Sequence, residues 1–114
     1  MDPSENKSIL YNEVMAIHDK VMPEMSTIHA LKRDLKAIEN KESKTLVINK
    51  IIELDKADEA MMVWMADFKL PEDKKTEEQY LAQEKLNIQN VSEKMFSSIS
   101  TAKYLLDSLK SVKK

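Results

Sequence analysis

The chain contains no cysteine and no glycine, and it has only three prolines and 5% aromatic residues. Without cysteine it can form no disulfide, no thiolate metal site, no iron–sulfur cluster and no cysteine nucleophile. Without glycine it can form no Walker loop, dinucleotide-binding fingerprint or nucleophile elbow, because the backbone of each requires glycine. Tight hairpin turns also favour glycine, so a β-meander is not expected.

Charged residues are abundant but nearly balanced in sign. The 18 Lys and Arg residues face 20 Asp and Glu residues, which gives a net charge of −2. A nucleic-acid-binding domain usually carries a basic stripe, so this balance argues against that class. No apolar run approaches the ~18 residues that a membrane-spanning helix needs, and no signal peptide is visible. The length of 114 residues predicts a single domain over residues 1–114.

Three long segments show helical periodicity and are separated by short polar breaks. We expect helices at about residues 3–39, 43–69 and 76–112, since the apolar seam of each alternates between spacings of three and four. Long helices joined by short connections must pack as antiparallel neighbours. A second apolar row widens the apolar face of the middle segment: Ile48, Ile52, Met62 and Trp64. The sequence therefore predicts an all-α, up-down-up antiparallel three-helix bundle. A homodimer that completes a larger helical assembly is the structural alternative.

Capping residues and prolines predict the helix boundaries. Residues 2–5 read Asp-Pro-Ser-Glu, a typical helix start. Asn40 is a candidate left-handed end for the first helix, and Thr76 with Gln79 matches a capping box at the start of the third. Pro23 removes one backbone hydrogen bond and crowds the carbonyl four residues earlier, so we expect the first helix to kink near residues 19–23.

A stripe of thioether and imidazole side chains follows the first predicted helix. Its members recur at spacings of three and four: Met15, His18, Met22, Met25 and His29. In an antiparallel hairpin they would face the second half of the next helix, which carries Met61, Met62, Trp64 and Met65. Methionine and histidine together bind Cu(I), so a copper-binding bundle is one hypothesis. Methionine also fills irregular core space, and packing is the more common role of such a stripe.

Three carboxylates interrupt the apolar seams at Glu24, Asp58 and Glu84. A ferritin-like metal site would require Glu three residues before an inward His, and neither His18 nor His29 has one. We therefore interpret the three carboxylates as structural polar contacts that fix helix register. One arrangement compatible with the hairpin pairs Asp58 with His18. No catalytic residue and no cofactor site is predicted.

Two strings in the sequence carry a resemblance to a known family. These are LYNEVMAIHDKVMPEM over residues 10–25 and LDKADEAMMxWM over residues 54–65, followed by Phe68-Lys69. They resemble a group of small helical bacterial proteins that are often labelled viral A-type inclusion protein-like. Members of that group typically carry a lipoprotein signal and one lipid-anchoring cysteine, which is absent from this chain. The resemblance implies a location in the cell envelope, periplasmic or outer, but no particular activity, and a cytoplasmic location stays open.

The sequence as a whole favours a non-enzymatic helical bundle that acts as an interaction or structural module for an unknown protein partner. The alternative function is Cu(I) binding by His18, Met22, Met25 and His29 with Met61 and Met65. No nucleic-acid partner is expected, and membrane contact would require a lipid anchor.

Overall fold

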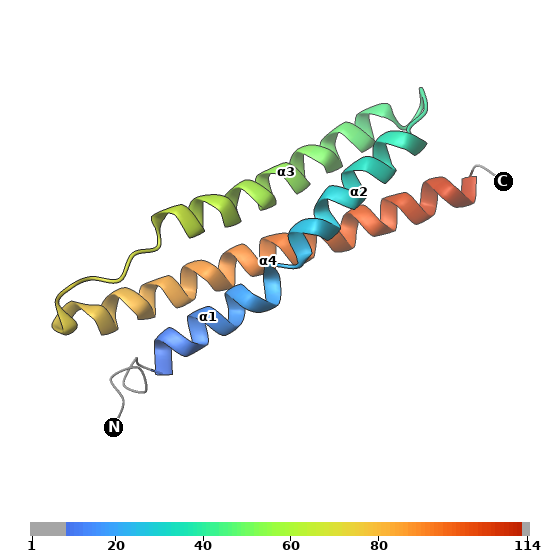
Figure 1. The fold of residues 1–114 in the computed structure, drawn as a ribbon. Coiled ribbons are helices and arrows are strands. Elements are labelled where there is room, and N and C mark those ends of the chain that lie inside the picture. The colour runs from blue at the N-terminus through green and yellow to red at the C-terminus, as the bar shows by residue number, and fades with distance from the viewer. Residues whose placement is uncertain (1–8, 113–114) are drawn as a thin grey trace.

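The computed structural model describes residues 9–112, and within them it contains four α-helices and no strand. The helices are α1 (Ile9–Val21), α2 (Glu24–Ile38), α3 (Lys44–Asp67) and α4 (Lys74–Val112). They lie alongside one another in an elongated molecule of 62 × 21 × 16 Å (Figure 1). The predicted all-α class is thereby confirmed. The predicted helix start near residue 3, with its cap at residues 2–5, lies outside the described residues.

Pro23 divides the first predicted helix into two. Because proline has no N–H, it cannot donate to the carbonyl of Asp19, and the helix stops at Val21. The next amides form shorter-range bonds: Met25 N–H donates to the Met22 carbonyl and Ser26 N–H to the Pro23 carbonyl, each at 3.2 Å. The predicted position of the disturbance is confirmed, whereas the prediction of one helix over residues 3–39 is wrong.

Asn40 links α2 to α3 by a reciprocal contact and not by a left-handed cap. Its side-chain Oδ1 accepts the Ser43 N–H at 2.8 Å, while the Ser43 Oγ accepts the Asn40 N–H at 2.9 Å. The pattern is that of a capping box, but it closes the turn before α3, whose own N-cap residue, Ser43, makes no side-chain cap hydrogen bond. No residue in the described part of the chain has a positive φ, so the left-handed conformation expected at Asn40 is wrong.

Asp73 immediately precedes α4, which begins at Lys74, two residues before the predicted start at Thr76. The Asp73 Oδ1 accepts the N–H of Lys75 at 2.9 Å, which satisfies one of the unpaired amides at the helix start. The Thr76 hydroxyl donates to the Asp73 carbonyl at 3.0 Å. Since that hydroxyl is directed back at Asp73, the capping box predicted for Thr76 and Gln79 is wrong.

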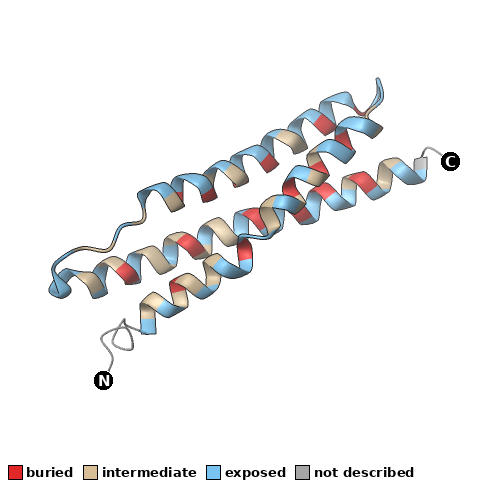
Figure 2. Ribbon diagram, viewed as in Figure 1, coloured by how far each residue is buried: buried red, intermediate tan, exposed pale blue. Residues whose placement is uncertain are grey.

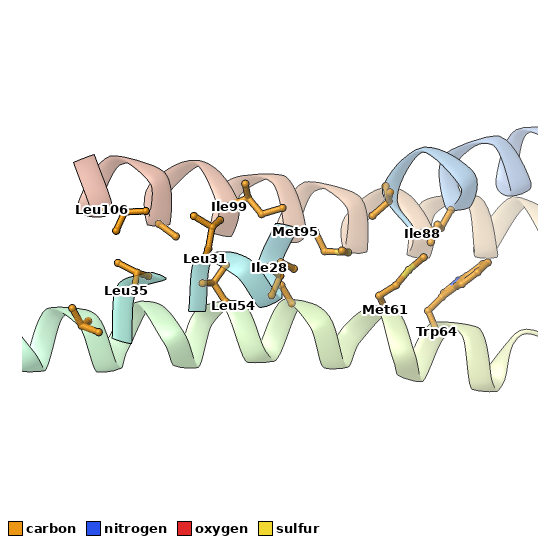
Figure 3. Close-up of a cluster of buried hydrophobic side chains, with 14 of the residues drawn as sticks. Ile28, Leu31, Leu35, Leu54, Met61, Trp64, Ile88, Met95, Ile99 and Leu106 are labelled. Atoms are coloured by element: carbon orange, nitrogen blue, oxygen red, sulfur yellow. The ribbon is translucent and has the colours of Figure 1, made fainter. Parts of the chain in front are cut away.

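The core lies along α4, which contacts each of the other three helices. Helix α2 also packs on α3, whereas the backbone of α1 comes close to α2 and α4 but nowhere close to α3 within the described residues. Figure 2 shows the buried positions on the inward sides of the helices, and Figure 3 shows their side chains meeting in the centre. The fully buried large side chains are Val14, Val21, Ile28, Leu35, Val47, Leu54, Met61, Leu81, Ile88 and Met95.

The second apolar row predicted for α3 divides into buried and exposed members. Trp64 is buried, but Ile48, Ile52 and Met62 are 39%, 44% and 53% exposed. Helices α2 and α4 cover the inner side of α3 only, and Figure 2 shows its outer edge largely exposed. The bundle therefore leaves an apolar row of α3 uncovered.

Candidate functional site

A row of four imidazole and aromatic side chains extends from α1 across the end of α3 to α4. The ring centroids of His18 and Trp64 are 5.9 Å apart, those of Trp64 and Phe68 are 4.9 Å apart, and those of Phe68 and Tyr80 are 5.8 Å apart. The Tyr80 hydroxyl accepts the backbone N–H of Lys69 at 2.7 Å. Tilted ring pairs at these separations are stabilising, so the row connects α1, α3 and α4 where the α1 and α3 backbones are far apart.

Asp58 pairs with His29 and not with His18. The His29 Nε2 lies 3.5 Å from the Asp58 Oδ2, while the Asp58 Oδ1 is buried without a hydrogen-bond partner. One turn further along, Lys32 of α2 forms an ion pair with Asp55 of α3. The pairing of Asp58 with His18 is wrong because the His18 ring packs on Trp64 and its Nδ1 lies 3.1 Å from the Asp19 Oδ1.

The Met and His stripe is divided by the break at Pro23. Met22 lies at the break and is 38% exposed, and His29 lies beyond it with a side chain 61% exposed. Met15, His18, Met25 and Met65 are half-buried, Met61 is fully buried and Met62 is exposed. Among the described residues, no group of three or more His, Asp or Glu could hold a metal ion. Copper binding through the thioethers stays a prediction.

The two remaining seam carboxylates lie in separate local environments. Glu24 is half-buried in the first turn of α2, beside the break. Glu84 is half-buried on α4, and its carboxylate accepts a hydrogen bond from the Asn87 Nδ2 at 2.6 Å. The Asn87 Oδ1 in turn accepts a hydrogen bond from the Gln83 Nε2 at 3.1 Å. The two carboxylates therefore lie on different helices, and Glu84 bonds to a neighbour on its own helix.

A surface groove of about 590 Å³ lies between α3 and α4. Its lining includes apolar atoms of Ala60, Val63, Trp64 and Val91, together with charged side chains of both helices: Lys56, Glu59, Asp67, Glu84 and Lys94. The Trp64 Nε1 is buried without a hydrogen-bond partner. The sequence did not reveal this groove, because it depends on the register of α3 against α4.

The outer face of α3 is the exposed side opposite its buried residues, and it consists of Ile48, Ile52, Asp55, Lys56, Glu59, Met62 and Val63. At its margins, Asp55 pairs with Lys32 of α2, and Lys56, Glu59 and Val63 border the groove. The four apolar members are between 39% and 53% exposed. Positions 48, 52, 55, 59 and 62 alternate between spacings of four and three, as in a helix that packs on another helix. Single exposed apolar residues are common, but aligned ones mark an interaction surface. The predicted second row contained this signal, although it was assigned to the core.

Comparisons with protein-family models, curated proteins and solved structures found no match to this chain. Over the described residues, no helix is both long enough and apolar enough to cross a membrane. Within residues 9–112, the fold is helical and the outer face of α3 is an exposed, partly apolar surface.

Proposed function

We propose that this chain is an up-down-up helical bundle that acts as a non-catalytic interaction module and binds another polypeptide through the outer face of α3. In this arrangement α1 and α2 together form the first rod of the bundle, α3 forms the second and α4 forms the third. The observation that carries the proposal is the group of four exposed apolar side chains, Ile48, Ile52, Met62 and Val63, on a helix whose opposite side is already packed. Burying such a row against a partner helix is favourable, at about 25 cal/mol for each Å² removed from water.

The distribution of polar groups supports an interaction role more than a reaction centre. His18 contacts Trp64, His29 contacts Asp58, and Glu84 contacts Asn87, so these groups lie in separate pairs on different parts of the bundle. A general acid and base must converge on one substrate within hydrogen-bond reach. Dispersed pairs of this kind are typical of groups that orient helices.

A location in the bacterial cell envelope is part of the proposal and rests on the resemblance of residues 10–25 and 54–69 to small helical lipoproteins. The resembling strings include the later part of the outer face of α3, from Asp55 to Met62. An interaction module held near a membrane by a lipid anchor would find its partner among envelope proteins. Fractionation of cells that express the native gene would test this location directly.

Site-specific photo-crosslinking in living cells tests the interaction role. A photo-reactive amino acid replaces Ile52 on the outer face, and a matched variant carries it at Lys103, an exposed position on α4. We expect a discrete crosslinked band from position 52 that is absent from position 103. Equal labelling at both positions, or no adduct at position 52, would contradict the proposed function.

A further inference from the structure

We propose that the partner of the outer face of α3 is a second copy of this chain. The inference rests on the proposed function, since it uses the same surface. The two α3 helices would pack antiparallel around a two-fold axis that passes between Asp55 and Lys56. A two-fold interface requires a surface that complements itself, and the outer face of α3 would set apolar against apolar residues at its ends and opposite charges at its centre.

Two of the four apolar residues of the face, Ile48 and Val63, are placed symmetrically about that axis. Ile48 and Val63 are equally distant from it, so each would lie opposite the other in the second copy. Ile52 and Glu59 are also equidistant, which sets the isoleucine against the aliphatic part of a glutamate side chain. Ile48 is 39% exposed and Val63 is 50% exposed, so both have surface to bury. An antiparallel pair would therefore gain an apolar contact at each end of the interface.

The charged residues at the centre of the face complement themselves across the same axis. Lys56 would lie opposite Asp55 of the second copy and one turn from its Glu59. Among the described residues, neither Lys56 nor Glu59 has an ion-pair partner, whereas Asp55 pairs with Lys32. Each copy contributes one positive and two negative charges, so the Lys56 of one copy would lie close to both acids, Asp55 and Glu59, of the other. Charge complementarity of this kind fixes the register of an interface.

The charges also disfavour competing registers. An axis at residue 55 would set the two Asp55 side chains against each other. Moving the axis to residue 57 would place Ile52 opposite Met62, which is favourable for apolar contact. The same shift would place Asp55 opposite Glu59 at the centre, where like charges repel. A parallel pair would likewise set Asp55 against Asp55 and Glu59 against Glu59. The pattern therefore selects the antiparallel pairing centred between Asp55 and Lys56.

The groove between α3 and α4 lies on the same side as this pairing. Val63 belongs both to the outer face and to the groove, as do Lys56 and Glu59. Ile48 of the second copy, which would lie opposite Val63, would come to the mouth of the groove, near Ala60 and Val91. An α3 helix of a second copy would thus pack on α3 and partly cover the surface between α3 and α4.

Sedimentation equilibrium of the purified full chain tests the pairing. At about 100 μM we expect a dimer, and Lys56→Glu should weaken its affinity by at least about tenfold because it places an acid opposite Asp55 of the second copy. Lys103→Glu makes the same change of charge at an exposed position of α4 and should leave the affinity unchanged. A monomer at this concentration, or equal effects of the two substitutions, would overturn the inference.

Introduced thiols test the register, since the chain has no cysteine of its own. A mixture of Ile48→Cys chains and Val63→Cys chains should form a disulfide-linked dimer on mild oxidation, while either variant alone should stay largely uncrosslinked. Crosslinking of each variant with itself would indicate a parallel pair and overturn the proposed geometry. If the chain is monomeric but position 52 crosslinks to a different protein in cells, the second copy is excluded while the interaction role stands. If both experiments are negative, both proposals fail.

Discussion

Asp58 is a seam residue whose polar contacts are only half complete. One carboxylate oxygen lies 3.5 Å from the His29 Nε2, and the other is buried without a hydrogen-bond partner. The His29 side chain is 61% exposed, so this pair contributes little to stability because water screens it. An unpaired buried acceptor costs free energy. Asp58 is therefore better explained as a residue that fixes the register of α2 on α3 than as one that strengthens the fold.

Replacing Asp58 by Leu should preserve the free energy of unfolding or raise it by about 1 kcal/mol, because an apolar side chain removes the unpaired oxygen and adds core contact. Urea unfolding of the purified chain measures this difference. Asp58→Asn is the matched control, since it keeps the shape of the side chain and removes its charge. A loss of several kcal/mol in Asp58→Leu would show that the carboxylate is an essential partner of His29.

At the scale of single residues, the sequence predicted which side of a helix a residue occupies better than it predicted which residue it contacts. The heptad placed Asp58 correctly on the seam, since periodicity alone decides which side of a helix a residue occupies. The partner of Asp58 depends on how α2 is aligned with α3, and on the break that separates α2 from α1. His18 and His29 lie on opposite sides of that break, so periodicity could not choose between them.

Pro23 shows how one residue sets the length of an element. Its φ of −62° and ψ of −21° lie within the helical range, so the interruption arises from the missing N–H and ring crowding and not from a distant backbone conformation. Val21 before the break and Ile28 after it are both fully buried, seven residues apart. The apolar seam therefore continues across the break.

Pro23→Ala should join α1 and α2 into one helix and raise the free energy of unfolding by about 1 kcal/mol, because a lost hydrogen bond is restored while part of the gain is offset by a more flexible unfolded chain. Circular dichroism and urea unfolding measure the two effects. Pro71→Ala, in the connection before α4, should leave the helical content unchanged. A decrease in stability for Pro23→Ala would mean that packing requires the bend.

At the scale of elements, periodicity predicted most of the buried positions but not the ends of the helices. Val14, Val21, Ile28 and Leu35 lie on the predicted seam and are fully buried. The entry to α3 depends on the reciprocal contact of Asn40 with Ser43, which combines two residues that are each common in loops. Such contacts arise from the path of the turn, which periodicity does not determine.

The four helices differ in how well the rest of the molecule supports them. Helix α4 contacts all the others, whereas the backbone of α1 approaches only α2 and α4. Helix α1 has two buried residues, Val14 and Val21, and an ion pair between Glu13 and Lys85 connects it to α4. Exposed ion pairs contribute at most about 1 kcal/mol. Because this ion pair adds little and only two residues of α1 are buried, we expect α1 to be the least stable helix.

Native-state hydrogen exchange should therefore show α1 opening before the rest of the bundle. We expect amides of α1 to be protected at least about tenfold less than those in the middle of α4, because few buried contacts hold α1 in place. Mass spectrometry of peptides from each helix measures the difference. Equal protection in α1 and α4 would show that the bundle opens as a single cooperative unit.

At the scale of the whole molecule, the all-α class followed from the composition and the periodic seams, and short connections indicated that neighbouring helices would lie side by side. The groove and the outer face of α3 could not be predicted in the same way. Both depend on which sides of α3 are covered by α2 and α4, and this follows from register and crossing geometry. Ile52 and Leu54 are both apolar, yet only Leu54 is buried.

The helices place the beginning of α1 and the end of α4 at opposite ends of the molecule (Figure 1). A pulling force applied between residues 9 and 111 would act along the 62 Å axis and load α1 and α2 against α4 in shear. In that geometry many side-chain contacts resist at once, whereas a force applied across the helices would peel them apart one contact at a time. The bundle should consequently withstand tension along its length better than across its width.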